Sequence, residues 1–228
     1  MHIIDLQEFF KLACEEYPKG ADEWEEEYER CLSHREFWDD ITKISDTDVR
    51  DIVMKFLNKW KCILPYEKAP ELAEKLRELE PKLHPLRNLD IANADLLEVI
   101  SIGSEKNRIL DQIAEVAAPL IELDMGKRRL GFTAASKILH MCVPEFFVMG
   151  DQNIRYAYGC EENGIGYANF MLWMSWVAKD LIGQAKDLFG QDKDSEQEIL
   201  KKYGNKRTLA KLIDQYNFFK YTQNVAKT

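Results

Sequence analysis

Residues 125–159, which carry most of the functional information in the chain, read MGKRRLGFTAASKILHMCVPEFFVMGDQNIRYAYG. A basic turn opens this segment, and apolar residues at helical spacing predict an amphipathic helix over 131–142. A hydrophobic connector that starts with Pro144 follows. Asp151 then opens a second helix over 151–158, because aspartate is among the residues preferred at a helix N-cap. The segment therefore predicts two helices joined by an apolar connector.

Helical periodicity extends over most of the rest of the chain. The clearest pattern runs from Val49 to Trp60, where apolar side chains recur at the spacing of a buried stripe that should include Trp60. Ser45 or Asp46 can cap this helix and Pro65 closes it. Further helices are predicted at 5–17, 21–33, 69–80, 93–102, 104–124, 166–189, 195–203 and 206–222. With no alternating strand pattern of useful length, the predicted fold class is all-α.

The predicted organisation is one helical domain over residues 41–228, with an acidic helical segment over residues 1–40 packed on it. A loop is predicted near the middle, around Pro81, Pro85, Asn88 and Asp90, but no long Gly/Ser linker divides the chain. Residues 1–40 hold thirteen acidic and four basic side chains, whereas residues 201–228 hold seven basic and one acidic. Two interpretations of the acidic segment remain open, a solvated helix face and a surface that shields or binds a partner.

Composition excludes several classes of protein. With 228 residues and 46% hydrophobic content the chain can build a sizeable core, which rules out global disorder. Its apolar runs are too short to cross a bilayer, so no membrane association is predicted. The five cysteines are odd in number and form no C-x-x-C pair, and the four histidines show no metal-ligand spacing. We therefore predict no metal and a reducing, cytoplasmic location.

Residues 125–159 resemble the helix-hairpin-helix DNA glycosylase superfamily, nearest to its monofunctional members. In that family a Gly-rich hairpin leads into a helix that begins near a Thr-Ala pair, which Thr133 and Ala134 match here. Eighteen residues after Thr133, the family's Asp-x-Asn-hydrophobic-basic run is matched by Asp151, Asn153 and Arg155. The resemblance covers about 35 residues and implies a DNA-glycosylase-like helical scaffold, with a helix-hairpin-helix-like element near 104–142.

The chain departs from the family pattern in three ways. The hairpin has only Gly126 and Gly131 around KRRL, where the family usually has Gly-hydrophobic-Gly. Phe132 and Thr133 stand where bifunctional members carry a Schiff-base lysine, and the four-cysteine iron–sulfur spacing of some members is absent. The resemblance therefore implies a monofunctional enzyme without a cofactor, and not a lyase.

The resemblance also implies a set of site residues and duplex DNA as a partner. Asp151 would be the catalytic carboxylate, which stabilises an oxocarbenium-like sugar or activates water during cleavage of an N-glycosidic bond. The residues implied in DNA binding are Gly126, Lys127, Arg128, Arg129, Gly131, Thr133, Asn153 and Arg155. Candidates for the wall of a base pocket are Lys137, His140, Tyr167 and Trp173.

Each of these assignments has a purely structural alternative. Asp151 can serve only as a helix cap, the basic turn can be a solvated surface, and the aromatic helix over 166–177 can belong to the core. At the level of the whole protein, the alternative function is a catalytically inactive helical module on the same scaffold. Such a module would bind another protein through the acidic N-terminus or the basic C-terminus.

Overall fold

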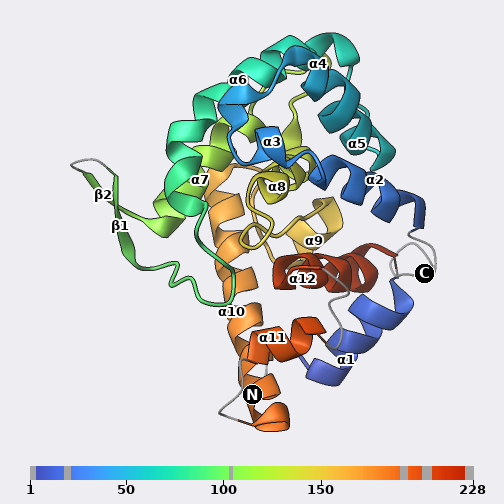
Figure 1. Ribbon diagram of the computed structural model, residues 1–228, viewed down its shortest axis with the longest axis vertical. Coiled ribbons are helices and arrows are strands. Elements are labelled where there is room, and N and C mark those ends of the chain that lie inside the picture. The colour runs from blue at the N-terminus through green and yellow to red at the C-terminus, as the bar shows by residue number, and fades with distance from the viewer. Residues whose placement is uncertain (1–3, 18–21, 103–104, 191–194, 202–206, 224–228) are drawn as a thin grey trace.

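Helices make up most of the molecule. The computed structural model describes residues 4–17, 22–102, 105–190, 195–201 and 207–223 (Figure 1). The α-helices are α1 Leu6–Phe10, α2 Asp22–Leu32, α3 Arg35–Trp38, α4 Asp46–Asp48, α5 Met54–Lys59, α6 Ala69–Leu83, α7 Ile109–Ile121, α8 Gly131–Cys142, α9 Gln152–Ala157, α10 Gly164–Phe189, α11 Ser195–Ile199 and α12 Leu209–Asn217. Wider π-helical turns continue three of them, at Lys11–Glu16, Val49–Val53 and Phe218–Gln223, and the two strands are β1 Val99–Ile102 and β2 Glu105–Arg108.

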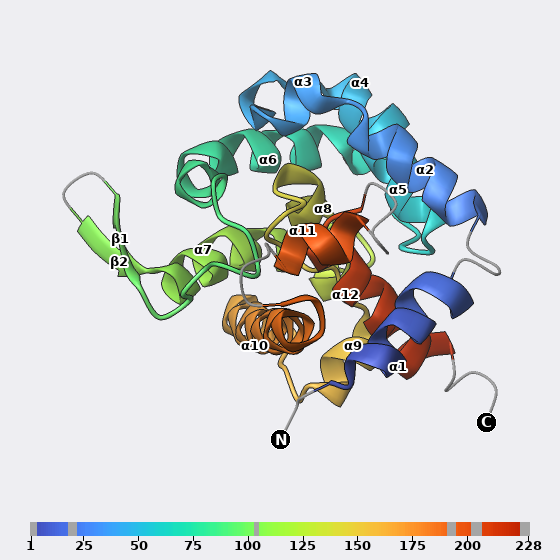
Figure 2. The ribbon, with the colours of Figure 1, turned by 60° about the horizontal axis from the view of Figure 1, so that its bottom comes forward.

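Helix α8 forms the centre of the fold. From Phe132 to Cys142 every side chain of α8 except Thr133 is buried, as expected of a helix that is packed on all sides. Figures 1 and 2 both place α8 in the interior, with other helices around it. The chain enters α8 from α7 through a tight turn, in which the Met125 amide donates to the Arg128 carbonyl (2.9 Å) and the Leu130 amide to the Leu123 carbonyl (2.8 Å).

Helix α10 is the longest element and packs against α7. The start of α10 approaches α7 so closely that a Cβ at Gly164 would lie 2.5 Å from the carbonyl oxygen of Ala114. Only glycine fits at this contact. The close approach fixes α10 against the α7–α8 pair, on which the candidate site is built.

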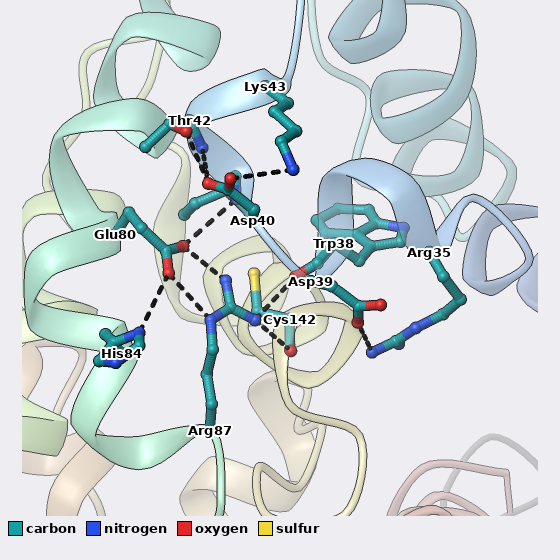
Figure 3. A network of polar contacts seen from close by, with 11 residues as sticks. Arg35, Trp38, Asp39, Asp40, Thr42, Lys43, Glu80, His84, Arg87 and Cys142 are labelled. Carbon is teal, nitrogen blue, oxygen red and sulfur yellow. Dashed lines mark hydrogen bonds and ion pairs between the residues drawn. The ribbon is translucent and has the colours of Figure 1, made fainter.

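A partly buried ion pair joins α6 to the centre of the molecule (Figure 3). The guanidinium of Arg87 donates to both carboxylate oxygens of Glu80, at 3.0 and 2.5 Å. Its Nη1 also donates to the carbonyls of Trp38, at the end of α3, and Cys142, at the end of α8 (2.8 and 3.2 Å). Glu80 in turn accepts the amide of Ile41 at 3.2 Å. We call this group the Arg87 clamp, because it ties three parts of the chain together.

The acidic N-terminal segment packs against the basic C-terminal segment. Glu25 forms ion pairs with Arg207 and Lys211, both at 3.2 Å, and Glu8 forms one with Lys220 at 3.4 Å. Side chains of residues 4–38 belong to the same hydrophobic core as those of residues 209–216. The opposite charges of the two segments are therefore partly used inside the molecule.

The helices predicted at 93–102 and 104–124 are wrong in part, because β1 and β2 form a two-stranded antiparallel sheet that pairs Val99 with Arg108. This sheet projects beside α7 in Figure 1. Before it, the carboxylate of Asp90 accepts the amides of Ala92 and Asn93, and that of Asp95 accepts the amide of Leu97. Such local side-chain bonds compete with helix formation, and the helix therefore begins only at Ile109.

Three further expectations are corrected or refined in the region before α7. Helix α5 ends at Lys59, and Trp60 is only partly buried. The predicted loop begins later than Pro81, which lies inside α6, because the helix continues to Leu83. Ser45 caps the helix in a reciprocal capping box with Asp48, and Asp46 does not. Among the described helices, none is both long and apolar enough to span a membrane.

Candidate functional site

A basic depression surrounds the N-terminus of α8. It has a volume of about 670 Å³, and residues 128–134 form one side of it. Four cationic side chains line it, those of Lys61, Arg128, Arg129 and Arg155, against one carboxylate, that of Glu162. The depression therefore offers an excess of positive charge to a ligand.

The helix end in this depression is open. Leu130 occupies the N-cap position of α8 and supplies no side-chain hydrogen bond, and the first turn contains no acidic residue. The first amides of a helix have no acceptor within the helix, and the helix dipole favours negative charge beside them. Gly131, which begins α8, has a φ of +80°, a conformation that favours glycine. An uncapped helix end beside several cations is suited to an anion such as phosphate.

The cations of the depression are held in different ways. Arg128 donates to the carbonyl of Ile63 at 3.1 Å, which joins the turn before α8 to the segment after α5. Arg155 is only 7% exposed, donates to the carbonyl of Cys160 at 3.0 Å and stacks on Tyr156, so it chiefly braces the end of α9. Arg128 is exposed and remains accessible to a ligand.

A second, smaller cavity adjoins the depression, and we call it the tryptophan cavity. It has a volume of about 250 Å³, below the roughly 300–1,000 Å³ of pockets for drug-sized ligands. Its lining residues are Trp24, Trp60, Lys61, Thr133, Lys137, Met149, Gly150, Asp151, Ile154, Asp214, Phe218 and Thr222. Lys61 and Thr133 line both cavities, so a bound molecule could contact both.

Asp151 lies in the tryptophan cavity and also caps α9. One carboxylate oxygen accepts the Ile154 amide at 2.9 Å, and the other accepts the Thr222 hydroxyl at 2.6 Å. The preceding residue, Gly150, passes so close to Phe132 that a Cβ would lie 3.0 Å from its ring. Ser136 accepts the Gly150 amide at 3.1 Å. Close packing and hydrogen bonds thus fix the position of the Asp151 carboxylate.

A group of buried charges lies behind this cavity, and we call it the Lys211 cluster. Lys211 is fully buried, and its ammonium pairs with Glu25 at 3.2 Å and with Asp214 at 3.3 Å. Burial raises the pKa of Asp214 to about 6, although Lys211 and Lys137 oppose the rise. Burial acts in the same direction on Glu25, but Lys211 and Arg207 outweigh it and hold the pKa of Glu25 below its usual value. Two carboxylates of one cluster thus differ in how readily they bind a proton.

The backbone beside both cavities is strained. Lys61 and Ile63 have positive φ values of 62° and 51°, which are uncommon for residues other than glycine and unusual for a β-branched side chain. Strained backbone is often found at functional sites, where the surrounding structure holds it in place. Here it places Lys61 at the boundary between the depression and the cavity.

The structure brings together some of the residues implied by the sequence and separates others. Asp151, Lys137 and Thr133 line the tryptophan cavity, whereas Gly131, Arg128, Arg129 and Arg155 line the basic depression together with Thr133. Gly126, at the tip of the turn with a φ of +91°, and the exposed Lys127 and Asn153 line neither.

His140, Tyr167 and Trp173 do not line either cavity. His140 is fully buried, and burial lowers its pKa to about 3, so the ring is neutral. Its Nδ1 lies 2.6 Å from the Phe147 carbonyl, which can only accept, so Nε2 accepts from the Tyr28 hydroxyl at 2.9 Å. Tyr167 is buried and donates to the Val148 carbonyl, and Trp173 is 39% exposed on α10. His140 and Tyr167 thus have core contacts.

Sequence reasoning missed the cavity residues that come from outside 125–159, namely Trp24, Trp60, Lys61, Asp214, Phe218 and Thr222. One signal in the sequence could have drawn attention to Asp214, because it is the single acidic residue after position 200 among seven basic ones. In the described ranges, no group of three or more His, Cys, Asp or Glu side chains is arranged to hold a metal ion.

Comparison with known proteins gives no relative from which a function could be transferred. No protein-family model, no curated protein and no solved structure matches the chain. The function is therefore argued from the geometry of the two cavities.

Proposed function

We propose that the protein binds duplex DNA at the basic depression and hydrolyses the N-glycosidic bond of a nucleotide whose base enters the tryptophan cavity. The observation that supports this proposal is the junction of the two cavities at Lys61 and Thr133. An anion site and a partly buried carboxylate, Asp151, lie on either side of that junction. Once its base has been flipped out of the stack, a nucleotide likewise has a phosphate on one side of the sugar and a base on the other.

The phosphate would bind at the open end of α8. Arg128, Arg129 and Lys61 add cationic groups that do not distinguish one base from another. Such contacts fix the position of the backbone, whereas the base is selected elsewhere. This division of roles matches the two different cavities, one basic and open and the other small, with three aromatic rings in its walls.

Asp151 would act on the sugar. In the reaction the bond between the sugar C1′ and the base nitrogen breaks, the electron pair leaves with the base, and C1′ takes on positive charge. Water then adds its hydroxyl to C1′, and its proton ends on the departing base. A negative carboxylate near C1′ stabilises the charged sugar or orients the water, and this effect is stronger at a site partly removed from solvent.

The proposal is tested with duplexes that each carry one damaged or mismatched base, assayed for free base and for alkali-sensitive sites. We expect the wild type to release base from at least one duplex, and Asp151→Asn to release none while still binding it, because the negative charge is removed and the phosphate-binding groups remain. Asp5→Asn is the matched control, since Asp5 also caps a helix but lines neither cavity. If the wild type releases no base from any duplex, the catalytic proposal is wrong.

Binding is tested with the same duplexes at several salt concentrations. Replacing Arg128 and Arg129 by alanine should weaken affinity and reduce the log–log salt slope by about 0.9 for each phosphate that is no longer neutralised. Lys127→Ala is the control, because Lys127 lies in the same turn but lines neither cavity. Equal effects of the three substitutions would place the binding surface outside the depression.

A second candidate function is a catalytically inactive module that binds another protein. It is favoured by the hydrogen bonds of Asp151. The Ile154 amide and the Thr222 hydroxyl each donate to one of its two oxygens, as expected of a carboxylate with a structural role. In that case Asp151→Ala would lower stability by about 1 kcal/mol and have no other effect. The terminal segments support this function less, since Glu25 and Glu8 pair with basic residues of the C-terminal segment.

A further inference from the structure

Two carboxyl groups of the described residues line the tryptophan cavity, and the proposed reaction uses only one of them. Asp151 stands at the start of α9, whereas Asp214 lies within α12. Hydrolysis of a glycosidic bond commonly uses two carboxyl groups, one that is charged and one that carries a proton for the leaving group. The cavity therefore holds the number of carboxyl groups that such a reaction needs.

The two carboxyl groups differ in how deeply they are buried. Asp151 is partly buried, whereas Asp214 is only 4% exposed. A flipped base enters a pocket ahead of its sugar, so the more deeply buried group is expected beside the base and the other beside the sugar. The rings of Trp24, Trp60 and Phe218 in the same walls suit a planar base. The depth of Asp214 thus matches a contact with the leaving group.

The ion pair of Asp214 with Lys211 is long and is shared with other groups. The Oδ2 of Asp214 lies 3.3 Å from the Lys211 ammonium, beyond the roughly 2.7–2.9 Å of a strong hydrogen bond between charged groups. The same ammonium pairs with Glu25 at 3.2 Å and lies 4.4 Å from the centre of the Tyr28 ring. Lys211 therefore does not give its whole charge to Asp214.

Groups from several helices act on the protonation of Asp214. Burial raises its pKa to about 6, Lys211 on the same helix and Lys137 on α8 oppose the rise, and Glu25 on α2 adds to it. Three buried hydroxyl groups also interact with its charge, those of Tyr17, Tyr28 and Tyr167. A carboxyl group that titrates near neutral pH can both hold a proton and give it up, as a general acid must.

We propose that Asp214 is the general acid of the reaction and donates a proton to a ring nitrogen of the base while Asp151 stabilises the sugar. The inference rests on the proposed function and adds a second catalytic residue to it. As the bond between C1′ and the base breaks, the electron pair moves onto the base, which takes the proton of Asp214 and leaves as a neutral molecule. Water then adds its hydroxyl to C1′, and its proton returns Asp214 to the protonated form. Without this proton, a neutral base would have to leave as an anion.

The test compares two bases that differ in their need for a proton. A neutral base requires one, whereas 7-methylguanine already carries a positive charge and leaves as a neutral molecule without it. Each is placed in a duplex, the neutral base being the one that the wild type releases fastest among the damaged and mismatched duplexes. Free base is measured by chromatography with the protein in excess over the duplex. We expect Asp214→Asn to slow release of the neutral base by about a hundredfold or more and to leave release of 7-methylguanine nearly unchanged.

Two further variants serve as controls. Asp51→Asn should alter neither rate, because Asp51 is exposed and lines neither cavity. Asp151→Asn should slow both, because the charged sugar forms with either base. Circular dichroism checks that each variant is folded. Equal slowing of both bases in folded Asp214→Asn, or no slowing of the neutral base, would overturn the inference.

The pH dependence of the wild type is a second test, which does not require Asp214→Asn to fold. Release of the neutral base should be nearly constant from about pH 5 to 6 and fall about tenfold for each pH unit above that, because only protonated Asp214 acts. Release of 7-methylguanine should lack this break. A proton taken from the solvent would instead give a rate that keeps rising as the pH falls through 6, and that result would overturn the inference.

The outcomes separate the inference from the proposed function. If the wild type releases 7-methylguanine but no neutral base, Asp214 is not a general acid and the proposed function stands. If it releases only the neutral base, the pH dependence decides. If it releases no base at all, the proposed function fails, and the role of Asp214 fails with it.

Discussion

Charged side chains are held in different surroundings in the Arg87 clamp and in the Lys211 cluster. In the clamp, the guanidinium of Arg87 binds both oxygens of Glu80 and two backbone carbonyls. Beside the Lys211 cluster, the ammonium of Lys137 lies over the Trp60 ring at 5.0 Å, and Lys137 and Asp214 both line the tryptophan cavity. A fully paired group contributes to the fold, whereas a carboxyl group with a perturbed pKa beside a cavity, such as Asp214, is expected where a ligand binds. The comparison favours a structural role for the clamp and a functional role for the cluster.

Breaking the clamp should have the largest effect on stability. Arg87→Met leaves the partly buried carboxylate of Glu80 without its partner, and we expect the free energy of unfolding in urea to fall by about 3 kcal/mol, the lower end for a buried pair. Arg50→Met is the control, because Arg50 pairs with Asp51 on the exposed surface, where such a pair is worth about 1 kcal/mol or less. A decrease below about 1 kcal/mol in Arg87→Met would mean that the clamp does not hold α3, α6 and α8 together.

The pH dependence of stability should distinguish the buried carboxyl group of Asp214, in the Lys211 cluster, from an exposed carboxyl group. The groups around Asp214 are Lys211, Lys137 and Glu25, and burial raises its pKa from 3.8 to about 6. Because the folded state binds this proton more tightly than the unfolded state, Asp214 favours folding below about pH 4, and the contribution is lost as the pH rises through about 6. The free energy of unfolding of the wild type, relative to Asp214→Asn, should therefore fall by about 2 kcal/mol between pH 4 and 7.

An exposed carboxylate, that of Asp51, should show the opposite dependence of stability on pH. The hydrogen bond from Arg50 lowers the pKa of Asp51, so its contribution to stability is present at neutral pH and is lost as the pH falls. The free energy of unfolding of the wild type, relative to Asp51→Asn, should thus stay nearly constant between pH 4 and 7 and decrease as the pH falls below about 4. The same direction in both variants would show that the environment of Asp214 does not disfavour its charge.

Removing the ammonium of Lys137 should have the smallest effect. Lys137→Met replaces a charge that lies over the Trp60 ring, in a side chain only 5% exposed, by an apolar side chain of similar length, and we expect stability to stay constant or to change by about 1 kcal/mol. Urea unfolding measures this change under the conditions used for Arg87→Met. A decrease of more than about 2 kcal/mol would assign Lys137 to the structure and not to a ligand.

The parts of the site that follow from local sequence were predicted correctly, and those that depend on tertiary packing were not. The cap at Asp151 and the bounds of α8 follow from neighbouring residues, through capping preference and helical spacing. Trp60 and Asp214 reach the cavity only because distant helices pack together, and no periodicity within either segment records that proximity. The glycosylase-like scaffold and the catalytic role of Asp151 remain predictions.

The distribution of charge is a second case that depends on tertiary packing. The acidic excess of residues 1–40 was compatible with two interpretations, a solvated helix face and a surface that shields or binds a partner. In the structure, part of it meets the basic C-terminal segment, as the pairs of Glu25 with Arg207 and Lys211 show. The composition shows the acidic excess and the basic excess, but only the fold shows that the two segments lie side by side.

The hydrogen bond from Thr222 to Asp151 has a consequence for how the protein is made. Asp214, Phe218 and Thr222 close one side of the tryptophan cavity, although its opposite walls, at Trp24 and Trp60, leave the ribosome far earlier. During synthesis the side of the cavity that these three residues form therefore cannot be completed until residue 222 has emerged. Nascent chains halted before residue 214 hold α8 and Asp151 but lack the side of the cavity that carries Asp214.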